Sequence, residues 1–83
     1  MTMTYALLRR RNMPDFYCAV PEDKPTPPFI TELAWEFMGE SEPQQPRPRG
    51  FNEDVARFAA NFQGYYTFRE RSVLERRLVS GSI

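Results

Sequence analysis

The chain has 83 residues and a mass of 9.8 kDa, which is enough for one domain and too little for two separate cores. Eleven basic residues balance eleven acidic ones, which excludes global electrostatic attraction to nucleic acid or to an anionic membrane. The absence of histidine and the single cysteine exclude His-dependent catalysis, zinc fingers, paired-cysteine metal sites and internal disulfides. We therefore expect one small domain, spanning 1–83, that is not an enzyme and holds no metal or cofactor.

Residues 3–20 predict a β-hairpin. A first apolar stretch ends in three arginines (9–11), the 12–15 segment carries the turn residues Asn, Pro and Asp, and a second apolar stretch follows. A helix that ends before Pro14 is the alternative, because the first stretch also contains good helix formers. We interpret Cys18 as a small buried hydrophobe, because no basic residue adjoins it to activate the thiol.

A helix over 27–38 is the clearest amphipathic element of the sequence. Thr26 suits the N-cap, and Gly39 suits the left-handed position after the helix end. Apolar residues at helical spacing form a single stripe, made of Phe29, Ile30, Leu33, Ala34 and Phe37. Trp35 lies opposite this stripe, which leaves two interpretations: the N-terminal hairpin covers it, or it is an anchor for a protein partner.

Residues 40–50 predict an extended, solvent-exposed linker. Pro43, Pro46 and Pro48 restrict the backbone, and apolar side chains are almost absent. X-Pro bonds in such a segment populate the cis form at about 5–30% and interconvert slowly. A prolyl isomerase is therefore a candidate partner that contacts these three prolines.

Two further helices are predicted over 53–63 and 68–79. Asn52 caps the first helix, and Thr67 with Glu70 forms a capping box at the start of the second. The first of these helices carries a second apolar stripe, made of Val55, Phe58, Ala59 and Phe62. The whole pattern predicts a mainly α fold: three helices and a short N-terminal β-hairpin, joined by proline-rich extended segments.

Charge is segregated along the chain although it sums to zero. Acidic residues prevail over 21–46, and every basic residue except Lys24 is an arginine, whose planar guanidinium suits carboxylates, phosphates and stacking. The candidate partner-binding residues are the clustered arginines, the tryptophan and two adjacent tyrosines: Arg9, Arg10, Arg11, Trp35, Arg47, Arg49, Tyr65, Tyr66, Arg69, Arg76 and Arg77. Glu32 and Glu36 share a face of the helix predicted over 27–38, and we expect this face to be solvated and to have no catalytic role.

These features predict a non-enzymatic binding protein that docks on a larger protein and modulates or inhibits it. The alternative is a small nucleic-acid-associated factor whose arginine clusters contact phosphates. No apolar stretch approaches the roughly 18 residues of a transmembrane helix, and the N-terminus lacks a secretory h-region. We therefore expect a cytoplasmic protein with no membrane contact.

The opening MTYALLRRRNMPDFYC over residues 3–18, the short neutral chain and the lack of catalytic signatures give a resemblance to a class of phage proteins. The chain resembles the small early proteins by which temperate bacteriophages modulate host enzymes, such as the anti-RecBCD accessory proteins. This resemblance implies a stoichiometric modifier of a host nuclease-helicase or of a similar DNA-processing enzyme. It is one of overall character, so no functional residue is carried over.

Overall fold

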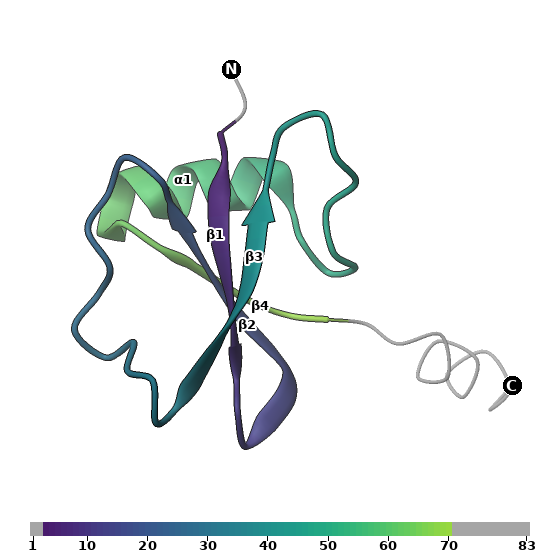
Figure 1. Cartoon of the computed structure of the whole chain (residues 1–83). Coiled ribbons are helices and arrows are strands. Elements are labelled where there is room, and N and C mark those ends of the chain that lie inside the picture. Colours follow the sequence, from purple (N-terminus) through teal and green to yellow (C-terminus); the bar gives the residue numbers. More distant parts are fainter. Residues whose placement is uncertain (1–2, 71–83) are drawn as a thin grey trace, which may run out of the picture.

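The computed structural model describes residues 3–70, which form a four-stranded antiparallel sheet and one helix (Figure 1). The elements in chain order are β1 (Tyr5–Arg10), β2 (Met13–Pro21), β3 (Trp35–Ser41), α1 (Glu53–Gln63) and β4 (Tyr66–Arg69). The strands lie in the order β3-β1-β2-β4, and α1 connects the two edge strands. The expected mainly α fold is therefore wrong, because the described part of the chain is mostly sheet.

The hairpin expected over 3–20 is confirmed. Strands β1 and β2 pair antiparallel from Tyr5 opposite Pro21 to Arg10 opposite Met13, with a register shift after Arg9. Since β1 also pairs with β3, and β2 with β4, the hairpin forms the centre of the sheet. Its side chains alternate between the two faces, and both faces are covered.

No helix forms over 27–38, where the sequence predicts the clearest one. Residues 27–34 make only local turns, such as the hydrogen bond from the amide of Ile30 to the carbonyl oxygen of Pro27 at 3.0 Å. The chain then enters β3 at Trp35, and β3 pairs with β1 along its length. Pairing with β1 satisfies the hydrogen-bonding groups of the backbone and buries Trp35, and these gains outweigh the local helical signals.

Gly39 also has a different role from the helix end that the sequence predicts. The pairing of β3 with β1 shifts register between Leu7, opposite Gly39, and Leu8, opposite Phe37, which leaves Met38 as an extra residue. Gly39 has a φ of 110°, the left-handed conformation that glycine adopts without steric cost. The glycine therefore supports a β-bulge in an edge strand.

Strand β4 occupies the start of the helix expected over 68–79. Thr67, expected as the helix cap, lies within the strand opposite Cys18. Aromatic and β-branched side chains favour a strand at this position, because each packs on a face of the sheet. Positions 71–79 of the expected helix lie outside the described residues, whereas the helix expected over 53–63 is confirmed as α1.

Each face of the sheet has its own apolar cluster. The cluster under α1 contains Tyr5, Leu7, Tyr17, Ala19, Ala56, Tyr66 and Phe68, with Phe51 partly buried against it. The cluster on the other face contains Cys18, Val20 and Trp35, and residues of the 22–34 segment such as Ile30 and Ala34 pack on it. Figure 1 shows α1 lying across the strand direction and the long segment from β2 to β3 passing along the side of the sheet.

Candidate interaction surface

The ends of α1 are set by local capping. The Asn52 side chain accepts a hydrogen bond from the amide of Val55 at 3.0 Å, and Glu53 and Asp54 place negative charge in the first turn. Gly64 ends the helix in the left-handed conformation, with φ 88°, and its amide donates to the carbonyl oxygens of Ala59 and Ala60. The helix is therefore held in place at both ends.

Alanines, not the large residues, form the inner face of α1. Ala56 and Ala60 are almost fully buried against the sheet, at 0% and 1% exposure. The space beneath them is already filled with aromatic rings: Tyr17 stacks on Phe68 at 5.4 Å, and Phe51 packs edge-on against the ring of Phe68 at 5.3 Å. Only small side chains fit between this aromatic layer and the helix backbone.

The large apolar side chains of α1 point to solvent. Phe58 is 71% exposed, Phe62 is 78% exposed and Val55 is 50% exposed. The two phenylalanine rings stack on each other, with centroids 6.0 Å apart and 12° between the planes. These three residues of the predicted stripe therefore face away from the core. A phenylalanine ring that stays in water forgoes about 2 kcal/mol of burial free energy, so the two exposed rings contribute little to the stability of the isolated domain.

We call this outward stripe of Val55, Phe58 and Phe62 the α1 outer face. Contiguous apolar surface of this kind marks interaction sites on soluble proteins. The sequence contained the signal for it, since the same residues stand out as an amphipathic stripe, but periodicity cannot show which side of a helix meets the core.

Trp35 belongs to the core, with 3% of its surface exposed. Phe16 from the hairpin packs against it at 5.9 Å between ring centroids, and Phe29 does so at 6.1 Å from the 22–34 segment. The interpretation that the hairpin covers the indole is confirmed, and the tryptophan is not accessible to a partner in this fold.

The arginines at positions 9–11 are engaged within the domain. Arg9 donates to Glu36 at 2.8 Å across the β1–β3 pair, which raises the pKa of the arginine and lowers that of the glutamate. The guanidinium of Arg10 lies 5.5 Å from the centre of the Trp35 ring, a cation–π contact. Arg11 donates to the carbonyl oxygen of Glu32 at 2.8 Å.

Arg47 lies inside the domain, with its side chain only 11% exposed. Its guanidinium donates to both carboxylate oxygens of Glu53, to the carbonyl oxygen of Met3, and to the carbonyl and hydroxyl oxygens of Ser41, at 2.7–3.2 Å. These bonds use all the N–H donors of an arginine. The structure thus assigns Arg47 to the fold and leaves it no donor for a partner.

The remaining predicted site residues do not gather on one surface. Arg69 pairs with Asp15 at 3.4 Å and follows Phe68, whose side chain faces α1, so Arg69 lies on the opposite face of the sheet. Arg49 is exposed. Arg76 and Arg77 lie outside the described residues.

The two tyrosines among the candidate partner-binding residues face opposite sides of the sheet. Tyr66 is buried under α1, and its hydroxyl accepts a hydrogen bond from the amide of Asn52 at 3.1 Å. Tyr65 packs with the cluster on the other face and is partly exposed.

Of the three prolines expected to meet a prolyl isomerase, Pro43 and Pro46 are exposed and Pro48 is half-buried.

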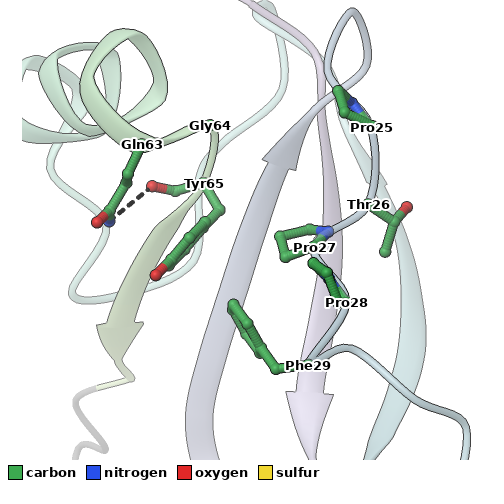
Figure 2. A pocket seen from close by; sticks show the side chains of 8 residues that line it. All are labelled: Pro25, Thr26, Pro27, Pro28, Phe29, Gln63, Gly64 and Tyr65. Carbon is green, nitrogen blue, oxygen red and sulfur yellow. Dashed lines mark hydrogen bonds between the residues drawn. The ribbon is translucent and has the colours of Figure 1, made fainter.

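A groove of about 370 Å³ lies between the 25–29 segment and the junction of α1 with β4 (Figure 2). Phe29 and Tyr65 meet edge to face at its base, 4.9 Å between centroids, and Gln63 donates to the carbonyl oxygen of Tyr65 at 3.1 Å. Its lining is made of Pro25, Thr26, Pro27, Pro28, Phe29, Gln63, Gly64 and Tyr65. The groove offers apolar contact, and its lining carries no acid–base pair for catalysis.

Cys18 should be chemically inert in the folded protein. The residue is fully buried, and burial raises the pKa of its thiol from 9.0 to about 12. We expect a thiol reagent at pH 8 to label the native protein only as fast as the chain unfolds, and the urea-unfolded protein at once. Because the thiolate forms more readily in the unfolded chain, stability should fall progressively between pH 9 and 12. Rapid stoichiometric labelling of protein that keeps its native circular dichroism spectrum would contradict this burial.

Within residues 3–70, no three His, Cys, Asp or Glu side chains gather in a way that could hold a metal ion. The single helix of that region is neither long nor apolar enough to cross a membrane. Comparison of the sequence with protein families and with curated proteins, and of the fold with solved structures, finds no match.

Proposed function

We propose that this protein is a non-enzymatic binding domain that docks on a larger protein through the α1 outer face and modulates it. The observation that carries the proposal is the exposure of Phe58 and Phe62, 71% and 78%, on a helix that is capped at both ends. A rigid helix loses little conformational entropy when it binds, and a few large side chains at the centre of an interface carry most of its binding free energy. The resemblance to phage modulators of host enzymes makes a nuclease-helicase the first partner to test.

The alternative of a nucleic-acid-associated factor has less support from the described residues. Phosphate binding needs free guanidinium groups on one surface, and the arginines at 9–11, Arg47, Arg57 and Arg69 already contact groups within the domain. The helix that presents the apolar face also carries acidic residues in its first turn, which repel phosphate.

The test is quantitative affinity purification of the tagged full-length protein from host lysate, followed by mass spectrometry. We expect the double replacement of Phe58 and Phe62 by serine to reduce the recovered partner at least about tenfold, because both rings would leave the interface. Thermal unfolding should change little, since both side chains are already in water.

The matched control is Leu33→Ser, which also removes an exposed large apolar side chain, 93% exposed, at a site remote in sequence from α1. It should retain the partner. Equal recovery with the wild-type protein and the double phenylalanine variant would overturn the proposal, and loss only with Leu33→Ser would move the docking site to the turn before β3.

A further inference from the structure

We infer that the outer edge of β3 binds an extended, basic segment of another protein by adding it to the sheet as a further strand. This inference goes beyond the proposed function, because it concerns a sheet edge and not α1. Strand β3 lies at one end of the sheet, and within the described part of the chain it pairs with β1 alone (Figure 1). The inference follows from the backbone groups on this edge, the side chains beside them, and their charge.

The hydrogen-bond pattern of the sheet leaves backbone groups of β3 unpaired on its outer edge. The amide of Arg11 donates to the carbonyl oxygen of Ala34 at 2.8 Å, and hydrogen-bonded pairs alternate along an antiparallel ladder. Arg9 and Glu36 therefore form the next such pair, and the amide and carbonyl groups of Phe37 point away from β1. No group in the described part of the chain bonds to them on that side.

The same alternation holds on the far side of the bulge. Alternate residues of β1 face β3, and these include Tyr5, so its partner Ser41 points inward and Glu40 points outward. Such an edge accepts a strand, because a strand brings free backbone donors and acceptors that a helix has already used internally. Phe37 and Met38 are 62% and 42% exposed, so they offer apolar contact to the added strand.

The charge at this edge favours a basic segment. Glu40 and Glu42 are exposed, and neither forms an ion pair within the described residues. Arg47 contacts the neighbouring Ser41, but its charge is already matched by Glu53. Lysine or arginine on an incoming strand therefore gains attraction here, and glutamate or aspartate meets repulsion.

A second copy of this chain is a poor occupant of the same edge. Pairing of two β3 strands would bring together Glu40 and Glu42 of both copies, while Arg9 on the adjoining strand is already paired with Glu36. Like charges and bulges are features that keep edge strands from pairing with copies of themselves. The acids that oppose self-association attract a basic strand, so they select for a basic partner.

Two synthetic peptides of about seven residues provide the test. Both alternate valine with a charged residue, lysine in one and glutamate in the other, so both favour the extended conformation and repel their own copies. Each is titrated into the 15N-labelled full-length protein while amide chemical shifts are followed. The bulge keeps the added ladder short, so we expect modest affinity, with shifts centred on 37–40 and at least about tenfold tighter binding of the lysine peptide.

Three variants locate the contact. Glu40→Lys combined with Glu42→Lys should reverse the preference between the peptides, because it changes the charge and leaves the backbone edge in place. Asp54→Lys, which reverses an exposed charge on α1, is the matched control and should keep the preference for lysine. Phe37→Pro removes the outward amide and leaves the inward groups of β3 intact, so it should abolish binding of both peptides.

Several outcomes would overturn the inference: equal binding of the two peptides, shifts centred on α1 or on the Phe29–Tyr65 groove, no binding at about 1 mM peptide, or an unchanged preference after the double charge reversal. So would a dimeric mass of the protein alone that becomes monomeric in Phe37→Pro, since the occupant would then be a second copy. Replacing Phe58 and Phe62 by serine should leave peptide binding intact, so this inference and the proposed function fail independently.

Discussion

Replacing Arg47 by alanine should lower the free energy of unfolding by about 3 kcal/mol, a large share of the stability of so small a domain. The side chain joins three segments that are far apart in the sequence: the chain before β1 through Met3, the end of β3 through Ser41, and the first turn of α1 through Glu53. Its removal leaves their oxygen atoms without donors, and hydrogen bonds to charged groups are each worth about 1.5–3 kcal/mol.

The packing of Arg47 adds to this effect. Its guanidinium lies 5.3 Å from the centre of the Tyr5 ring and 5.1 Å from that of Phe51, so truncation also opens a space beside two core aromatics. Lysine keeps the charge but not the planar fork, and it has fewer donors. Arg47→Lys should therefore recover only a minor part of the lost stability.

Urea unfolding followed by circular dichroism measures both variants. Arg49→Ala is the matched control, because Arg49 is an exposed arginine two residues away in the same proline-rich segment. Its replacement should change the free energy of unfolding by less than about 0.5 kcal/mol. If Arg47→Ala were no more destabilising than Arg49→Ala, the hydrogen-bond network around Arg47 would not contribute to the fold.

Gly50→Ala should destabilise the protein by about 3 kcal/mol or more. Gly50 has a φ of 91°, a conformation that costs other residues about 1–2 kcal/mol. A Cβ atom there would lie 3.2 Å from the carbonyl carbon of Arg69 and overlap its oxygen. Backbone at the end of β4 cannot rotate away as a flexible side chain can, so either the strand end or the segment before α1 must move.

Gly64 is the control that separates the two contributions. It has nearly the same backbone conformation, with φ 88°, but nothing lies within 4 Å of a Cβ placed on it. Gly64→Ala should therefore cost only the conformational penalty, about 1 kcal/mol. Equal melting temperatures for the two variants would show that the close approach of Gly50 to Arg69 has no energetic weight.

Features that depend on neighbouring residues could be predicted from the sequence. Asn52 and Gly64 bound α1 where their capping chemistry indicates, and the turn residues of 12–15 place the hairpin. The false predictions also came from genuine local signals. Thr26 and Gly39 suit the ends of a helix, and Thr67 with Glu70 matches a capping box, yet both stretches contain aromatic strands that pair with the hairpin.

The candidate site was visible in the sequence only as a pattern. Periodicity groups Val55, Phe58 and Phe62 on one side of a helix, but it assigns that side to the core by default. The opposite orientation arises because the aromatic layer of the sheet leaves room only for Ala56 and Ala60. Conversely, Trp35 stands out from the stripe of a helix that does not form, whereas as part of β3 it belongs to the core.

Local sequence is enough to specify α1, the central hairpin and the capping and turn residues that bound them, because these depend on interactions within a few residues of one another. The three-dimensional fold is what makes strands of 35–41 and 66–69, since a strand exists by pairing with a partner distant in the chain. The fold also determines which charged side chains pair within the domain and which remain available to a partner. Eleven basic residues in a neutral chain suggested docking arginines, but in residues 3–70 most of them hold the domain together, and two phenylalanines on its helix face the solvent.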